Sequence, residues 1–97
     1  MSKKRFSPQK PFSKRQIGNI PDDKPAVYEI LNRGGKNIYT GIAKRGRVQE
    51  RLEEHLPGKK DAVPGGDGFR IKPMPSIDQA RREEKRIIKQ ENPKHNE

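Results

Sequence analysis

The hydrophobic pattern of this chain becomes regular at residue 26, where two short apolar runs flank a polar, glycine-rich segment. The runs are Ala26–Leu31 and Asn37–Ile42, and both are rich in residues that favour β-strands. Gly34 and Gly35 lie between them, and paired glycines supply the positive φ that a tight turn requires. The sequence therefore predicts a β-hairpin, with a turn over residues 33–36.

A helical pattern follows the hairpin. An apolar residue recurs at every fourth position, which is the spacing of one helix face: Val48, Leu52 and Leu56. A second row at the same spacing is basic: Arg47, Arg51 and His55. We therefore expect a helix over residues 46–56 that projects the basic row from one side.

The remaining elements are a strand and a helix. Residues 69–72 alternate between apolar and basic side chains, which predicts a strand with a positive outer face. Ser76 and Gln79 form a capping box that starts a helix, and Pro93 ends it. The predicted fold is α+β over residues 24–97, with a three-stranded antiparallel sheet flanked by helices in the order β-β-α-β-α.

Residues 1–23 have no such periodicity. They contain several prolines and an excess of basic residues, so we expect a disordered basic tail. Its cations, which include Lys3, Lys4 and Arg5, would engage phosphates by counterion release. Phe6 and Phe12 either stack on the bases of a single strand or are incidental.

Composition narrows the class of partner. Lysine and arginine number 23 against 13 acids, which gives a net charge of +10. Such a basic chain favours nucleic acid over a membrane surface, because the N-terminal region shows no amphipathic apolar face. The absence of cysteine excludes disulfides and thiolate metal sites and is compatible with a cytoplasmic location. No apolar run is long enough to span a bilayer.

One carboxylate falls on the apolar face of the last predicted helix. At a period of 3.6 residues, Glu84 lies in the middle of this face and Glu83 lies beside it, towards solvent. The apolar face consists of Ile77, Ala80, Ile87 and Ile88. An inward acid is costly without a partner. Three explanations remain open: an ion pair with an arginine, a metal site, or a bend in a poorly packed helix.

These parts, in this order, resemble the GIY-YIG nuclease superfamily. Four segments carry the resemblance: Ala26-Val27-Tyr28, Tyr39-Thr40-Gly41, Arg51-Leu52-Glu53-Glu54-His55, and a C-terminal series of Ala80, Glu84, Ile88, Pro93 and Asn96. The resemblance covers residues 24–97. It implies a single-domain, metal-dependent endonuclease that acts on DNA, with Mg²⁺ or Mn²⁺ as its cofactor.

The resemblance also implies a role for each of six side chains. Glu84 would hold the metal ion, and Tyr28 would position or deprotonate the attacking water. Tyr39 would organise the site, and Arg51 would stabilise the transition state. His55 would occupy a position where the family has His or Tyr, and Asn96 would brace the site. If both tyrosines line one site, they must share a sheet face, which requires Tyr39 to pair with Ile30.

Two of the chain's departures from the family pattern concern the cations of the site. Ile42 stands where related repair nucleases carry lysine, so Lys44 or Arg45 would have to supply that cation. Arg47 competes with Arg51 for the catalytic arginine position. Two other functions therefore remain open: a non-catalytic module that binds nucleic acid on the same fold, and a subunit that recruits a protein partner through its tail.

Overall fold

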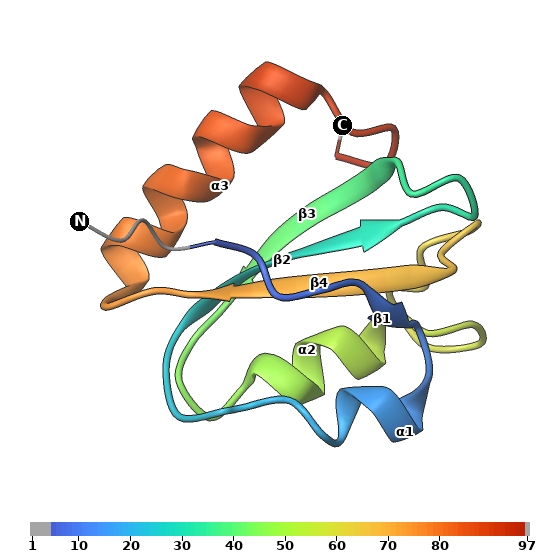
Figure 1. Cartoon of the computed structure of the whole chain (residues 1–97), viewed down its shortest axis with the longest axis horizontal. Coiled ribbons are helices and arrows are strands. Elements are labelled where there is room, and N and C mark those ends of the chain that lie inside the picture. Colours follow the sequence, from blue (N-terminus) through green and yellow to red (C-terminus); the bar gives the residue numbers. More distant parts are fainter. Residues whose placement is uncertain (1–4, 97) are drawn as a thin grey trace.

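The computed structural model describes residues 5–96 as an antiparallel sheet with helices on both faces (Figure 1). The elements are β1 (Lys10–Pro11), α1 (Lys14–Ile17), β2 (Ala26–Leu31), β3 (Asn37–Ala43), α2 (Val48–Glu54), β4 (Gly68–Pro73) and α3 (Ile77–Glu91). The strands are ordered β1-β4-β2-β3. The expected α+β class and antiparallel sheet are confirmed. The expected count of three strands is wrong, because β1 and α1 precede the predicted β-β-α-β-α series.

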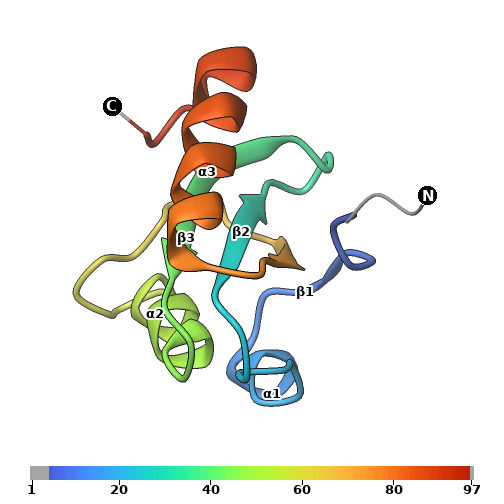
Figure 2. The ribbon, with the colours of Figure 1, turned by 90° about the vertical axis from the view of Figure 1, so that its left-hand side faces the viewer.

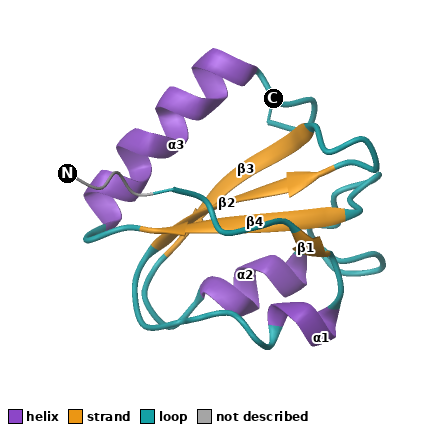
Figure 3. Cartoon of the chain, in the orientation of Figure 1, coloured by secondary structure: helices purple, strands orange, loops and turns teal. Residues whose placement is uncertain are grey.

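The helices divide between the two faces of the sheet, with α3 on one side and α1 and α2 on the other (Figure 3). Within residues 5–96, no helix is both long and apolar enough to cross a membrane. The larger apolar core lies on the α2 side and includes Tyr28, Ile30, Leu52 and Phe69. A smaller cluster lies on the α3 side and consists of Val27, Met74, Ala80 and Ile87.

The hairpin has the predicted strand register. Ile30 pairs with Tyr39, so both tyrosines lie on the same face of the sheet. A bulge follows, and Leu31 pairs with Asn37. The Asn32 N–H then donates to the Lys36 carbonyl oxygen at 2.9 Å, which makes the turn tighter than the expected four residues at 33–36.

The N-terminal segment is part of the folded unit from residue 5 onwards. β1 pairs antiparallel with β4, and the Ser7 N–H donates to the Ile71 carbonyl oxygen at 2.7 Å. Ile17 and Ile20 are buried in the larger core. The expectation of disorder is therefore wrong for residues 5–23, because an edge strand accommodates proline and two isoleucines supply apolar burial. Lys3 and Lys4 lie outside the described residues.

The two phenylalanines of this segment have structural roles. The Phe12 ring packs on the Phe69 ring, with centroids 6.1 Å apart. The Arg70 guanidinium lies 4.8 Å from the centroid of the Phe6 ring. Phe6 and Phe12 are both partly buried against the apolar clusters. Neither of the two sequence explanations, base stacking or incidental placement, describes them.

The basic residues of β4 do not form the expected positive outer face. Arg70 Nε donates to Glu29 Oε1 at 2.7 Å, and Lys72 Nζ donates to Glu83 Oε2 at 2.7 Å. Arg86 on α3 also pairs with Glu83 at 2.7 Å. The expectation that Glu83 faces solvent is wrong, since its side chain is 14% exposed. A basic strand thus meets acids from β2 and α3.

Candidate active site

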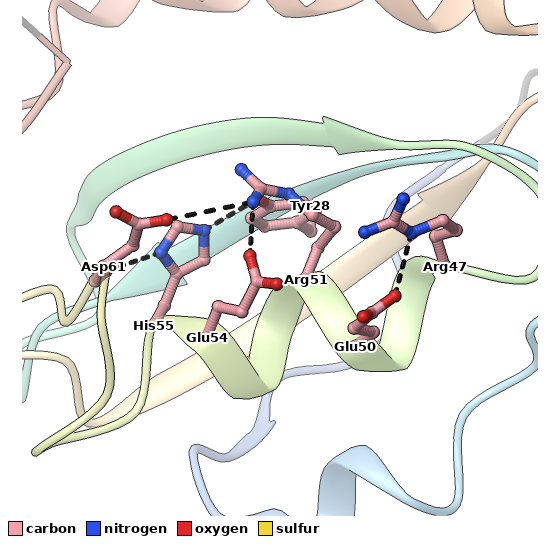
Figure 4. Close-up of polar contacts among 7 residues, drawn as sticks. All are labelled: Tyr28, Arg47, Glu50, Arg51, Glu54, His55 and Asp61. Carbon is pink, nitrogen blue, oxygen red and sulfur yellow. Dashed lines mark hydrogen bonds and ion pairs between the residues drawn. The ribbon is translucent and has the colours of Figure 1, made fainter.

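Tyr28 and His55 form a buried hydrogen-bonded pair beneath the sheet (Figure 4). Tyr28 Oη lies 2.8 Å from His55 Nε2, and His55 Nδ1 lies 2.8 Å from the Asp61 carbonyl oxygen. A carbonyl can only accept, so His55 Nδ1 carries the proton and Nε2 accepts from the Tyr28 hydroxyl. Burial lowers the pKa of His55 and raises the pKa of Tyr28. Both groups are therefore neutral at pH 7.

Gly41 leaves the space that the Tyr28 ring occupies. The two residues are direct partners across the hairpin. A Cβ atom at Gly41 would lie 2.5 Å from both Cζ and Oη of Tyr28, which is far inside van der Waals contact. Glycine at this position is therefore required for Tyr28 to reach His55.

Tyr39 completes a cluster of three rings. Its ring centroid lies 4.8 Å from that of His55 and 6.3 Å from that of Tyr28. Tyr39 is half-buried, and burial raises the pKa of its phenol while the nearby Arg51 opposes that rise. The three rings come from β2, β3 and the residue after α2, which the register of the hairpin brings together.

Arg51, rather than Arg47, lies beside the tyrosines. The Arg51 charge acts to lower the pKa of Tyr28. Its guanidinium pairs with Glu54 and lies 3.9 Å from Asp61 Oδ2. Arg47 pairs with Glu50 at 2.8 Å, and its side chain is 53% exposed. Of the two arginines, Arg51 is therefore the one that lies beside the tyrosines.

Glu84 and its neighbour Glu83 have opposite environments on α3. Glu83 pairs with Lys72 and Arg86, which hold the pKa of its carboxyl at about 2. Glu84 is half-buried and has no hydrogen bond or ion pair within residues 5–96. Burial raises the pKa of Glu84, although Arg81 and Lys85 oppose the rise. Its charge contributes to the raised pKa of Tyr28 and of Tyr39.

Two of the three explanations for Glu84, an ion pair with an arginine and a bend in the helix, find no support among residues 5–96. The structural ion pair belongs to Glu83, and α3 runs without interruption from Ile77 to Glu91. The described part of the chain contains no group of three or more His, Asp or Glu side chains able to hold a metal. A metal at Glu84 would therefore complete its coordination with water and substrate oxygens, which suits Mg²⁺.

Asn96 fixes the outer edge of β3. Its side-chain oxygen accepts from the Thr40 N–H at 2.7 Å, and its side-chain nitrogen donates to the Thr40 carbonyl oxygen at 2.8 Å. The His95 N–H donates to the Ile38 carbonyl oxygen at 2.9 Å. Because Thr40 lies between Tyr39 and Gly41, the C-terminal segment holds the strand that carries the site.

Two clefts open on either side of Arg51. The first has a volume of about 310 Å³ and four cations in its lining: Lys44, Arg47, Arg51 and Arg81. No acid lines it. The second has a volume of about 500 Å³, and its polar lining includes Tyr39, His55, Lys60, Asp61 and His95. α2 and α3 flank β3 on its two faces, so the first cleft lies between the two helices (Figure 2).

The predicted cations separate into two groups. Lys44 and Arg47 line the first cleft, and Lys44 thus places a cation near Ile42. Arg45 is exposed outside both linings, and Arg5 lies in a different pocket with Arg70.

Four polar residues of the clefts were not anticipated from the sequence: Arg81, Lys60, Asp61 and His95. Arg81 lies three positions before Glu84, and this spacing is a signal that would have identified it. Lys60 and His95 come from irregular segments that carry no comparable signal.

Solved structures with the same fold include the GIY-YIG N-terminal endonuclease domain of UvrC from Thermotoga maritima, bound to its catalytic magnesium. This domain is 27% identical, has a TM-score of 0.70, and the match covers 87% of this chain and 96% of that one. A point mutant of it, with asparagine replaced by alanine, is 27% identical with a TM-score of 0.67 over 84% and 91% of the two chains. A tyrosine-to-phenylalanine mutant is 26% identical with a TM-score of 0.71 over 87% and 96%.

No protein-family model matches the sequence, and no curated protein matches it. The relationship is therefore carried by the structure, by the coverage of both chains, and by the motif residues that the fold gathers around β3. On these grounds, the chain belongs to the GIY-YIG superfamily.

Proposed function

We propose that this protein is a metal-dependent endonuclease that hydrolyses DNA phosphodiester bonds with a single Mg²⁺ held by Glu84. The observation that carries this proposal is the half-buried Glu84 carboxylate, which lacks a counter-ion within residues 5–96 and whose charge acts on the pKa of both Tyr28 and Tyr39. Arg81, one turn before Glu84 on α3, lines the cleft of four cations. Support also comes from the similar structures, which are endonuclease domains bound to a catalytic divalent cation.

The donor set at Glu84 suits a hard cation. One carboxylate together with waters and substrate phosphate oxygens is a common way for proteins to hold Mg²⁺, and Mn²⁺ accepts the same oxygen ligands. When bound, the ion supplies charge stabilisation at the scissile phosphate and its leaving oxygen. A cation at Glu84 would also offset the desolvation of a carboxylate that no lysine or arginine of the described chain pairs with.

Tyr28 and His55 can move a proton away from the attacking water. The Tyr28 hydroxyl donates to Nε2 of His55, so this nitrogen is the natural acceptor of the phenol proton. Tyr28 is 0% exposed, so its Oη would orient or deprotonate a water that enters beside His55 and Tyr39 from the second cleft. The Asp61 carbonyl fixes the tautomer of His55, and Tyr39 packs against the imidazole ring.

Arg51 and Asn96 complete the proposed machinery. Arg51 borders both clefts, so its guanidinium can contact a phosphate that bridges them and stabilise charge as it develops in the transition state. Asn96 holds β3 at Thr40 and acts as a positioning residue.

A second candidate function is a nucleic-acid-binding module without catalysis. The first cleft favours it, because four cations without an acid can hold a phosphodiester backbone in the absence of a metal. Ile42, in place of the expected cation, also favours it. This candidate predicts salt-dependent binding with no turnover for any divalent cation or DNA form.

The decisive experiment compares Glu84→Gln with Glu83→Gln in a supercoiled-DNA nicking assay with Mg²⁺ or Mn²⁺. Glu84→Gln should lower the cleavage rate by about 100-fold or more, because it removes the proposed metal ligand. Its melting temperature should be unchanged or raised, because the raised pKa of Glu84 reflects a costly buried charge. Cleavage that survives Glu84→Gln undiminished would refute the proposal.

Glu83→Gln is the matched control on the adjacent position of α3. It should keep most of the cleavage activity but lower the stability, because Lys72 and Arg86 lose their shared carboxylate. Tyr28→Phe provides a further check. It keeps the ring over Gly41 but removes the hydroxyl, so it should also lose cleavage.

A further inference from the structure

The outer side of α3 carries a row of cations that the proposed chemistry does not use. Arg81, Lys85 and Lys89 recur at every fourth position, about 6 Å apart along the helix axis, and Arg82 flanks them. All four are exposed. Within residues 5–96, Lys85, Lys89 and Arg82 form no ion pair, and Arg81 only approaches Asp78 at 3.7 Å. We call Arg81, Lys85 and Lys89 the α3 basic row.

The α3 basic row is continuous with the first cleft through Arg81, which belongs to both. The helix on the other side of β3 carries mixed charge. The pocket beside α2 is lined by Glu50, Glu53 and Glu54 together with Lys59 and Lys60, and Glu50 and Glu54 pair with Arg47 and Arg51. Because α2 and α3 flank β3 (Figure 2), a polyanion that enters the cleft is attracted most strongly over α3, where Lys85 and Lys89 have no acid partner within residues 5–96.

The aromatic side chains indicate which form of nucleic acid this surface fits. The chain has three phenylalanines, two tyrosines and no tryptophan. Phe12 packs on Phe69, and Tyr28 lies in the core. Tyr39 lines the second cleft and Phe6 lines a separate pocket, so none of the five rings belongs to the α3 basic row. Proteins that bind single strands generally stack bases on open aromatic rings. This surface offers charge to phosphates but no stacking platform.

We infer that the α3 basic row binds the sugar-phosphate backbone of double-stranded DNA and guides it into the cleft of Arg51. A duplex presents dense, regular phosphate charge that cations recognise without reading bases. The inference deepens the proposed function by naming a paired substrate, and it rests on that function only for what happens to the DNA after binding.

Binding is tested with all variants in the Glu84→Gln background, which prevents cleavage. The affinity for a short DNA duplex and for one of its strands is measured at several salt concentrations. Lys85→Gln/Lys89→Gln should lower the slope of log K against log salt for the duplex by about 1.8, at about 0.9 per lost phosphate contact. Glutamine preserves helix propensity. The parent should bind the duplex more tightly than the single strand.

The matched control is Lys14→Gln/Arg15→Gln on α1, which removes the same charge from exposed positions on the other face of the sheet (Figure 1). Its slope should equal that of the parent. Equal losses in the two double variants would overturn the inference, because total charge would then explain binding. Tighter binding of the single strand would also overturn it.

The two proposals can fail separately. If the chain cleaves DNA but Lys85→Gln/Lys89→Gln binds as the parent does, the α3 basic row is not the docking surface and the nuclease proposal stands. If the α3 variant loses duplex affinity but the wild-type chain cleaves nothing with Mg²⁺ or Mn²⁺, the surface is confirmed and the nuclease proposal fails.

Discussion

The two faces of the sheet are stabilised in different ways. The face towards α2 buries a continuous apolar core, and its main polar contact is the neutral Tyr28–His55 pair. The face towards α3 has a smaller apolar cluster and joins Glu29 to Arg70 and Glu83 to Lys72. On the face towards α2, apolar burial makes the larger contribution to the stability of the fold. On the face towards α3, ion pairs contribute alongside apolar burial.

This difference between the two faces explains why the environment of Glu84 points to a functional role. On a face where the other buried or half-buried acids have cationic partners, a half-buried acid without one is an exception. Glu29 and Glu83 are held by Arg70 and Lys72, whereas Glu84 meets only the more distant charges of Arg81 and Lys85. Such an exception is characteristic of a functional group rather than of a structural contact.

The largest expected effect is on the α2 side, in the N-terminal segment. Ile17 is 0% exposed in the larger core, so Ile17→Ala should lower the free energy of unfolding by about 2–5 kcal/mol through lost burial and a cavity. Ile88→Ala on α3, where the side chain is only partly buried, should cost about 1 kcal/mol. Chemical denaturation measures both.

If both substitutions lowered the free energy of unfolding equally, the two faces would not differ in apolar burial as described. A negligible cost for Ile17→Ala would contradict the packing of the N-terminal segment itself.

The next effect combines stability with activity. Gly41→Ala places a Cβ atom against the Tyr28 phenol, so it should cost about 1–3 kcal/mol and displace Tyr28 from His55. Cleavage should fall together with stability. Gly18→Ala is the control, because its Cβ would make only ordinary contacts, at 3.5 Å to the Lys14 carbonyl oxygen and 3.6 Å to that of Arg15. Thermal melts and nicking rates distinguish the two.

The smallest effect is a pH dependence that differs between the faces. The pKa of His55 is lowered from 6.5, so the unfolded chain binds the proton first, and stability is lost as the pH falls below 6.5. The pKa of Glu83 is lowered from 4.5 to about 2, so its contribution is present above 4.5 and is lost as the pH falls from 4.5 towards 2.

Urea unfolding across this pH range, with wild type, His55→Gln and Glu83→Gln, measures each contribution as a difference. His55→Gln should remove the change just below pH 6.5, and Glu83→Gln should remove the change below pH 4.5. Burial raises the pKa values of Glu29 and Glu84, so their contribution makes the free energy of unfolding fall as the pH rises above 4.5. Wild type and both variants share this contribution, so it cancels in the difference between wild type and each variant. Wild-type slopes retained in both variants would contradict these assignments.

Much of the fold was predictable because it is encoded locally. The glycine pair and the apolar runs specified the two strands of the hairpin, and the family resemblance implied the pairing of Ile30 with Tyr39. Ser76 caps α3 as expected, with its Oγ accepting from the Gln79 N–H at 3.2 Å. The family resemblance, rather than local pattern, implied that Tyr28, Tyr39, Arg51 and His55 would share one site.

The unpredicted features depend on contacts between distant segments. Asp22 Oδ1 accepts from the Val48 N–H at 2.7 Å, so the N-terminal segment caps the helix that carries Arg51. No local pattern around Asp22 indicates this cap. The partnership of Glu83 with Lys72 is similar, because a helical wheel gives the direction of a side chain but not what lies opposite it.

The sequence by itself determined the hairpin and the positions of α2 and α3, because periodicity, turn glycines and a capping box act over a few neighbouring positions. The residues of the candidate site were expected only from the resemblance of the motifs to a known superfamily. Only the tertiary structure decided that residues 5–23 fold and that Glu83 is paired while Glu84 is not. Those outcomes depend on the free energy of burying sparse apolar side chains and of matching charges across the sheet, which no local stretch of sequence contains.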